Sequence, residues 1–468
     1  MARELWSRSA LELASNIASK EVSSVEVVQA HLDRIAEVNP TVNAVVKVLA
    51  DSALAAAKVA DEETARGVSR GKFHGVPFTI KENIDVAGQP TTQGIPALAE
   101  AIPPQNAPIV DRMLGSGAIP IGRTNLPDLG LRIHTDSTLY GRTKNPWNLE
   151  RTAGGSSGGE GAALASGMSP IGLGNDIGGS LRNPAHCCGI ASIKPSTGVI
   201  PDAQYFITED MTLSAQIMLN QGVMARTIAD VRAGLGVVAG AHPRDPLSVP
   251  AVLTDLEPNQ RLTVAVMAEP PGGSTHPGVA AVVRSAADAL AKAGHRIVEV
   301  TPPEFELACQ VWGAQMNGEL TPNLPILESV MGEGGQKFLK LTQLSMPSVG
   351  LTELLAAQMQ RNGLGRKWGL WFEEYPILLC PTWTQPAFVA DADIADAAGA
   401  AATVELMRPV LPPNLLGLPA VVVPAGMADD LPVGVQVIGA RYTDLRCLAI
   451  AEQIETACGI RTPINPKM

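Results

Sequence analysis

The first part of the chain repeats its apolar residues at helical spacing. Residues 9–39 predict two helices, and the second opens with Ser23 and Glu26 at the spacing of a capping box. We expect this helix to stop at Asn39-Pro40, because proline disfavours a helical conformation in the residue before it. The Ala-rich stretch 45–68 predicts a third helix. The chain is therefore expected to begin with a helical layer.

From residue 73 onward, short apolar runs alternate with helical patterns. A strand is predicted at 75–80, ending on Lys81, followed by a helix at 110–116 and a strand at 118–121. A second unit of this kind covers residues 262–300. Such alternation indicates an α/β fold with parallel strands joined by crossover helices. Later apolar runs predict strands at 375–380, 420–424 and 433–439, of which the last two resemble a hairpin, and a final helix at 444–457.

The segment 302–375 differs in character, since it carries several aromatic residues, including Trp312 and Trp368, within a helical pattern. One interpretation is a packed helical layer over the core, and the other is a cap that lines a substrate pocket.

No internal repeat or long linker interrupts the chain, so we expect one large domain over residues 1–468. Its expected parts are N-terminal helices at 1–68, an α/β core at 69–300 and 375–468, and the cap-like helical segment at 301–374.

Composition and charge narrow the classes of function. The 468 residues are 46% hydrophobic and 17% charged, which excludes global disorder. A net charge of −11 argues against nucleic acid or an anionic membrane surface as a partner. The six cysteines form no C-x-x-C pair, so zinc is not indicated and free thiols fit a reducing compartment. Residues 1–20 do not resemble a signal peptide and no apolar run reaches about 18 residues, so we expect a cytoplasmic protein.

Two Gly/Ser clusters, at 154–161 and 175–182, are the candidate chemical centre. The run Ile177-Gly178-Gly179-Ser180 lies between a predicted strand and a predicted helix, where successive backbone N–H groups form a concavity for an anion. An oxyanion hole needs this geometry. Ser180 would then be a nucleophile beside its own oxyanion donors.

A serine nucleophile needs a base, and Lys81 at the end of an apolar strand is the better candidate than any histidine. Burial would lower the pKa of Lys81 toward neutrality, because burial disfavours the charged amine. Ser156 can carry the proton between Ser180 and Lys81, since a hydroxyl both accepts and donates. The plainer interpretations are a surface lysine and a flexible Gly/Ser linker.

A nucleophile elbow is a competing motif, because residues 155–159 fit G-x-S-x-G with Ser157 as the nucleophile. That motif requires a preceding strand, and residues 145–152 do not read as a convincing one.

The motifs together resemble the amidase signature family of serine hydrolases. Its hallmarks match Gly154–Gly159, Asp176–Ala185, Cys188-Gly189 and the Gly75–Asp85 lysine segment, and most of residues 5–235 and 375–457 are covered. The resemblance implies a single α/β/α domain with a twisted mixed β-sheet core covered by helices.

The same resemblance implies roles for individual residues. It implies a catalytic triad in which Ser156 carries a cis peptide bond, oxyanion donors on four successive residues, and supporting hydrogen bonds from three others. The triad is Lys81, Ser156 and Ser180, the oxyanion donors are Ile177, Gly178, Gly179 and Ser180, and the supporting residues are Ser157, Asp176 and Arg182.

We therefore expect hydrolysis of neutral, hydrophobic or aryl amides through a Ser180 acyl-enzyme, with carbamates (urethanes) and esters as further substrates. Neither a metal nor an organic cofactor is expected. The partner is a small-molecule amide or carbamate, with no nucleic acid and no membrane, and a homo-oligomer is left open. The alternative is a glutamine-dependent amidotransferase subunit in a complex, against which Asn183 stands where that subfamily is expected to have Gln. Residues 201–221 and 302–375 depart from the family pattern, so the resemblance does not imply which substrate is used.

Overall fold

The computed structural model describes residues 4–204, 211–345 and 349–467. Within these ranges one eleven-stranded sheet draws its strands from residue 45 to residue 439, which supports our proposal of a single domain. The strands of this sheet are β1 Val45–Val48, β2 Pro77–Lys81, β3 Ile119–Thr124, β8 Ile171–Asp176, β9 Ala191–Lys194, β10 Asn220–Ala225, β11 Thr263–Val266, β12 Arg296–Glu299, β13 Ile377–Pro381, β14 Ala420–Ala428 and β15 Leu431–Gly439.

The sheet is mixed, with strand order β1-β3-β2-β8-β10-β9-β14-β15-β13-β11-β12. Strands β3, β2 and β8 run parallel to one another, as do β13, β11 and β12. The central pairs from β8 through β15 to β13 are antiparallel. The predicted crossover units and the predicted C-terminal hairpin are therefore confirmed, and so is the mixed α/β sheet.

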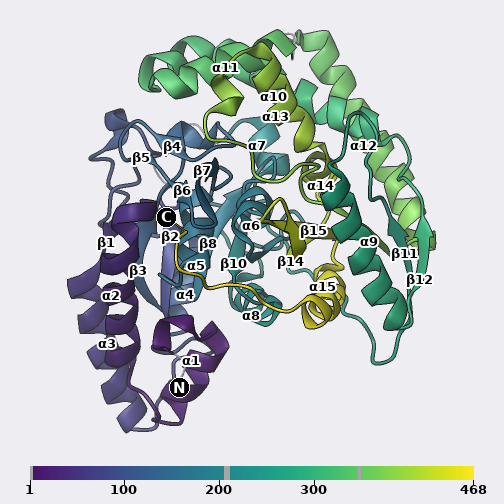
Figure 1. The fold of residues 1–468 in the computed structure, drawn as a ribbon. Helices are drawn as coiled ribbons and strands as arrows, with labels where there is room; N and C mark the ends of the chain where they lie inside the picture. The colour runs from purple at the N-terminus through teal and green to yellow at the C-terminus, as the bar shows by residue number, and fades with distance from the viewer. Residues whose placement is uncertain (1–3, 205–210, 346–348, 468) are drawn as a thin grey trace.

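Helices cover both faces of this sheet (Figure 1). Side chains of alternate strand residues separate into two apolar layers: Val433, Val435 and Val437 of β15 face one layer, whereas Ile438 faces the other. Such alternation follows from the two-residue period of a strand. The helices are α1 Ala10–Ala18, α2 Ser24–Val42, α3 Ala50–Ala65, α4 Pro108–Gly115, α5 Gly158–Ala165, α6 Arg182–Cys188, α7 Leu213–Met218, α8 Ile228–Val238, α9 Pro277–Lys292, α10 Phe305–Val330, α11 Glu333–Ser345, α12 Leu351–Glu374, α13 Ala397–Leu406, α14 Leu411–Leu416 and α15 Asp444–Cys458.

The segment 302–375 is helical, as predicted, and forms α10, α11 and α12. Figure 1 shows α10, α11 and α13 gathered at one end of the molecule, away from the N-terminal helices α1 to α3. None of the helices in the described ranges has both the length and the apolar character needed to cross a bilayer.

Two predictions about the N-terminal region are wrong. Helix α2 continues past Pro40 to Val42, and it ends where Asn43 adopts a left-handed conformation at φ 52°. The Asn39 side chain accepts hydrogen bonds from the N–H groups of Ala44 and Val45 at 2.8 Å each. These bonds fix the direction in which the chain leaves the helix, but Asn39 does not terminate the helix.

The predicted helix at 45–68 is shorter than expected, because its first residues form β1 and only Ala50–Ala65 is helical. Strand β1 pairs antiparallel with β3, a distant contact that local spacing does not reveal. Part of the segment 201–221, which departs from the family pattern, lies outside the described residues.

Helix α15 packs on β14 through side chains that are completely buried, among them Leu448. We expect Leu448→Ala to lower the free energy of unfolding by about 2–5 kcal/mol, because it removes buried apolar atoms and leaves a cavity. Chemical denaturation measures this loss. Leu355→Ala on α12 is the control, since Leu355 is 56% exposed and should change stability by about 0.5 kcal/mol or less. Equal losses in the two variants would contradict this packing.

Candidate active site

The carboxyl ends of two adjacent parallel strands bring the site together. Strand β2 ends at Lys81 and lies beside β8, which ends at Asp176, with Thr79 opposite Gly172. Parallel strands end at the same edge of a sheet, which is where α/β folds place functional groups. This register sets Lys81 next to Asn175, although the two are far apart in sequence.

Lys81 is completely buried and has two polar neighbours. Its Nζ lies 2.7 Å from Ser156 Oγ and donates to Asn175 Oδ1 at 2.8 Å. The Asn175 amide in turn donates to Asn83 Oδ1 at 3.0 Å, which fixes the orientation of its oxygen toward Lys81. Since Asn175 takes one N–H of the amine, the lone pair of a neutral Lys81 is available to Ser156.

Burial lowers the pKa of Lys81 from 10.5 to about 7, against the opposing effect of the carboxylates of Asp176 and Glu160. The direction is the one predicted from the sequence. A substantial fraction of Lys81 is therefore neutral, and able to accept a proton, at neutral pH.

Ser156 lies in a loop that packs too tightly for side chains on its neighbours. The Gly155–Ser156 peptide bond is cis, as the family resemblance implied. A Cβ on Gly155 would lie 2.6 Å from the carbonyl carbon of Ile133, so only glycine fits there. A Cβ on Gly130 would lie 3.3 Å from Ser156 Oγ, which places the 130–133 loop directly against the serine hydroxyl.

The turn 177–180 presents backbone N–H groups that have no acceptor among the described residues. They belong to Ile177, Gly178 and Ser180. Gly179 was predicted as a fourth donor, and this prediction is wrong, because the Gly179 N–H donates to Asp176 Oδ1 at 2.7 Å. The donor set that the geometry supports is therefore Ile177, Gly178 and Ser180.

Trp312 of α10 holds this turn from the side. Its Nε1 donates to the Ile177 carbonyl oxygen at 2.9 Å, and a Cβ on Gly178 would meet its ring at 2.7 Å. In a trans peptide the C=O and N–H point in opposite directions. The bond to Trp312 therefore turns the Gly178 N–H away from α10.

Asp176 and Arg182 form a buried ion pair at 2.9 Å beneath the turn. Asp176 also accepts the N–H groups of Gly179 and Leu181. Burial alone would raise the pKa of Asp176, but the charge and hydrogen bonds of Arg182 lower it to about 2. Arg182 further donates to Gln436 Oε1 at 2.6 Å and to Asn414 Oδ1, so it ties the turn to β15 and α14. Asp176 and Arg182 thus both contact the turn or its surroundings, and their supporting role stays a prediction.

Ser157 is the predicted supporting residue whose side chain does not match its expected role. Its Oγ is buried without a hydrogen-bond partner in the described ranges, and only its backbone N–H contributes, donating to the Ser180 carbonyl oxygen at 3.2 Å. The side chain packs over β8, where Gly174 leaves room for it.

The nucleophile-elbow alternative needs a correction to one of its arguments. A strand does precede residues 155–159, because β7 (Asn148–Thr152) pairs with β6 (Lys144–Asn145). This two-stranded ribbon lies outside the main sheet. A further two-stranded ribbon is made by β4 (Asp136–Ser137) and β5 (Gly141–Arg142).

Ser180 opens into an apolar cavity, and the residue is 9% exposed. Across the described residues its hydroxyl makes no hydrogen bond, so the contact between Lys81 and Ser156 is the part of the triad that is formed. The cavity wall combines the 130–133 loop with α10, α11 and the start of the 407–411 segment. Its apolar members include Leu131, Ile133, Trp312, Met316, Phe338 and Met407. The 302–375 segment thus lines the cavity that holds Ser180, as the cap interpretation expected.

Glu160 is a buried carboxylate that sequence reasoning missed. It lies on α5, four residues after Ser156, and accepts hydrogen bonds from Thr79 Oγ1 and, at 2.7 Å, from Thr124 Oγ1. Thr79 and Lys81 are two residues apart on β2, so their side chains share one face of the sheet. Burial raises the pKa of Glu160 to about 7.

Three other residues were also missed. Asn175 could have been suspected from its place beside Asp176, whereas Trp312 carries no local signal for its bond to the turn. Asn183 was noted only as a departure from a subfamily; it donates to the carbonyl oxygens of Gly155 and Gly178 at 3.1 and 3.2 Å, and so connects the two Gly/Ser clusters. The described part of the chain contains no group of three or more His, Cys, Asp or Glu side chains that could hold a metal ion.

Comparison with known proteins identifies the class. The family model described as Amidase matches residues 26–448. The indoleacetamide hydrolase of Bradyrhizobium diazoefficiens is 40% identical over 461 residues, covering 97% of this chain and 87% of that protein. A glutamyl-tRNA(Gln) amidotransferase subunit of Salinispora arenicola is 33% identical, covering 98% and 99% of the two chains.

A solved structure, that of 6-aminohexanoate cyclic dimer hydrolase complexed with substrate, superimposes with a TM-score of 0.85 at 27% identity and covers 99% of this chain and 100% of that one. The protein is thus an enzyme of the amide-hydrolysing class. The chain belongs to the amidase family, as its resemblance to the amidase signature enzymes predicted.

The position of Lys81 predicts a pH dependence. If Lys81 is the base, it must be neutral, so kcat/KM for an uncharged amide should rise with pH through an apparent pKa near 7. Lys81→Met should lower kcat/KM by about 10²–10⁴-fold and remove the rise of kcat/KM with pH, which is the acid limb of the profile. The control is Lys72→Met, because Lys72 is exposed and lies outside the site. An acid optimum in the wild type, or full activity in Lys81→Met, would contradict the assignment.

Glu160 predicts a shift of the same limb. Glu160 becomes ionised as pH rises through its own pKa of about 7, and its ionised form raises the pKa of Lys81, so Glu160→Gln should move the acid limb of the kcat/KM profile to lower pH. Thermal unfolding of the variant separates this shift from a loss of folded protein. Glu150→Gln serves as the control, since Glu150 is exposed. A limb that stays at its wild-type position in folded Glu160→Gln would show that Glu160 does not act on Lys81.

Proposed function

We propose that this chain is a serine amidase that hydrolyses neutral amides with an apolar or aryl acyl group. The observation that carries the proposal is the 2.7 Å contact between the buried Lys81 amine and Ser156, beside a turn with free N–H groups. A buried amine with a pKa near 7 and a neighbouring hydroxyl make a proton relay, and the turn supplies a site for negative charge.

The proposed reaction starts with proton transfer. Neutral Lys81 takes a proton from Ser156, which takes one from Ser180, and Ser180 Oγ attacks the amide carbonyl carbon. The N–H groups of Ile177, Gly178 and Ser180 stabilise the oxyanion of the tetrahedral intermediate. The proton returns through Ser156 to the amide nitrogen, the C–N bond breaks, and the amine leaves. Water, activated by the same relay, then releases the acyl group from Ser180.

The apolar cavity supports the substrate class. Arg132 lines this cavity, but its guanidinium is paired with Asp391 and Asp393. The other lining side chains offer no charge to compensate a charged acyl group, whereas an aryl or alkyl group gains by burial there. The relative named indoleacetamide hydrolase makes arylacetamides the first compounds to test. Aryl carbamates and esters pass through similar tetrahedral states and are proposed as further substrates.

The alternative, a glutamine-dependent amidotransferase subunit, draws on the 33% identity to such a subunit. The Asn183 side chain, however, is fully engaged by backbone carbonyls and by Trp383 Nε1, and contributes to the shape of the site rather than to a glutamine contact. An enzyme of that kind would need a partner subunit for activity and would use glutamine.

A substrate panel on the purified chain tests these proposals. It contains indole-3-acetamide, a p-nitroanilide, an aryl carbamate, an aryl ester and glutamine. We expect the purified chain to hydrolyse the arylacetamide without a partner and to leave glutamine intact.

Ser180→Ala should lower kcat by at least about 10³-fold, since it removes the nucleophile and leaves only the oxyanion donors and substrate binding. A serine-reactive probe followed by peptide mapping should label Ser180. Labelling of Ser157, or activity on glutamine alone, would overturn the proposal.

A further inference from the structure

A second cavity lies beside the one that holds Ser180. Its volume is about 600 Å³, and its wall includes Asn317 of α10 and Val404 of α13, which also line the Ser180 cavity. Helix α10 presents neighbouring faces to the two spaces, with Trp312 and Met316 toward Ser180 and Gly313 and Ala314 toward the second cavity. The two cavities therefore meet along α10 and α13.

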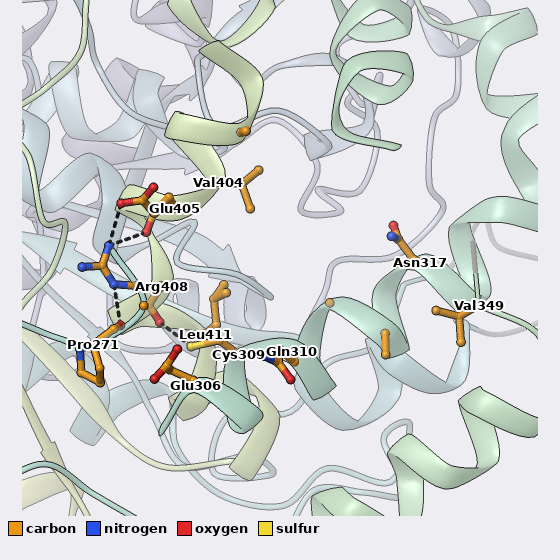
Figure 2. A pocket seen from close by; sticks show the side chains of 14 residues that line it. Pro271, Glu306, Cys309, Gln310, Asn317, Val349, Val404, Glu405, Arg408 and Leu411 are labelled. Carbon is orange, nitrogen blue, oxygen red and sulfur yellow. Dashed lines mark hydrogen bonds and ion pairs between the residues drawn. The ribbon is translucent and has the colours of Figure 1, made fainter. Parts of the chain in front are cut away.

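The second cavity is charged at one end, in contrast to the apolar Ser180 cavity. Figure 2 shows Arg408, Glu405 and Glu306 together at this end, and Asn317 and Val349 toward the other. Two carboxylates and one guanidinium lie at this end, which gives it a formal net charge of −1.

The N–H groups of the Arg408 guanidinium already have hydrogen-bond acceptors within the protein. Arg408 Nε donates to the Pro271 carbonyl oxygen at 2.9 Å, Nη2 to that of Pro270 at 2.8 Å, and Nη1 to that of Glu405 at 3.1 Å. The Glu405 side chain accepts the Ser274 N–H at 3.0 Å. Glu306 makes no hydrogen bond or ion pair within the described ranges, and its carboxylate is exposed at the cavity, where its charge also acts on Arg408. The group left for a ligand is thus a carboxylate, which favours a cation or a hydrogen-bond donor.

Amide hydrolysis produces such a cation. As the C–N bond breaks and the Ser180 Oγ–carbon bond persists, the leaving nitrogen takes the proton that came from Ser180. The free alkylamine then takes a second proton from water and becomes an ammonium ion at neutral pH. The acyl part of the substrate suits the apolar cavity, and the amine part suits a space that ends in carboxylates.

We propose that the second cavity binds the amine portion of secondary amides, so that the substrates include N-alkyl amides whose alkyl chain ends in an ammonium or another donor group. This proposal rests on the proposed function, because it assigns the amine side of the same reaction. Asn317 and Val404, which line both cavities, would then lie where the substrate passes from one cavity into the other.

The test compares three amides of the same arylacetic acid: the primary amide, the N-butyl amide and the N-(4-aminobutyl) amide. Ala401→Phe on α13 fills the second cavity, and Ala402→Phe is its matched control, because Ala402 is exposed and does not line the cavity. We expect Ala401→Phe to lower the kcat/KM ratio of the N-butyl to the primary amide by about tenfold or more, and Ala402→Phe to leave this ratio at its wild-type value.

Charge is tested separately by Glu306→Gln, an exposed position where folding is not at stake. The kcat/KM ratio of the aminobutyl to the butyl amide should fall by roughly two- to fivefold, as expected for an exposed ion pair. Glu353→Gln on α12 is the control, since Glu353 is exposed and lies outside the cavity.

The possible failures are distinguishable. Wild-type hydrolysis of the primary amide without hydrolysis of either N-alkyl amide would overturn the present inference and leave the proposed function standing. Equal ratios in Ala401→Phe and Ala402→Phe, together with an unchanged ratio in Glu306→Gln, would also overturn it. Absence of hydrolysis of all three amides would instead count against the proposed function.

Discussion

The burial of the Lys81 amine is the physical constraint on which the site depends. A charged amine in this position would lose its hydration, and the nearby carboxylates of Asp176 and Glu160 and the Asn175 side-chain oxygen oppose that loss. Asp176 is in turn neutralised by Arg182, so its field at Lys81 is weaker than that of an isolated carboxylate. The balance leaves the amine close to the point where it exchanges its proton at neutral pH. Each neighbouring charge therefore adjusts the same quantity, the free energy of the protonated lysine.

Helix α10 contacts both the turn at residues 177–180 and the two cavities. Through Trp312 it fixes the peptide plane that orients the Gly178 N–H, and through other residues it forms walls of both cavities. A ligand that displaces the Trp312 ring would also disturb the turn at Ile177. The proposed substrate wall and the proposed oxyanion donors consequently depend on the same helix, which would help to keep those donors in place.

The sequence was sufficient to predict the elements and candidate residues that depend on short stretches of neighbouring residues. The crossover units, the C-terminal hairpin and the candidate residues Lys81, Ser156 and Ser180 follow from apolar runs and from ordered motifs. The incorrect predictions arise from contacts between residues that are distant in the sequence. Strand β1 exists because it pairs with β3, and the Gly179 N–H is occupied because the Asp176 carboxylate folds back under the turn. Trp312 and the second cavity could not be predicted, since their partners lie more than a hundred residues away along the chain or on another helix.

The origin of the cavity walls has a consequence for how this enzyme can diversify. Lys81, Ser156 and Ser180 all precede residue 190, whereas most of the apolar wall around Ser180 comes from residues 312–407. Most of this wall and the candidate catalytic residues thus lie in different stretches of the chain, although Leu131 and Ile133 belong to the earlier stretch. If the proposed function holds, substitutions in residues 312–407 can change which substrates are accepted and leave Lys81, Ser156 and Ser180 in place. Such substitutions would have to retain Trp312, because its Nε1 donates to the Ile177 carbonyl oxygen in the turn.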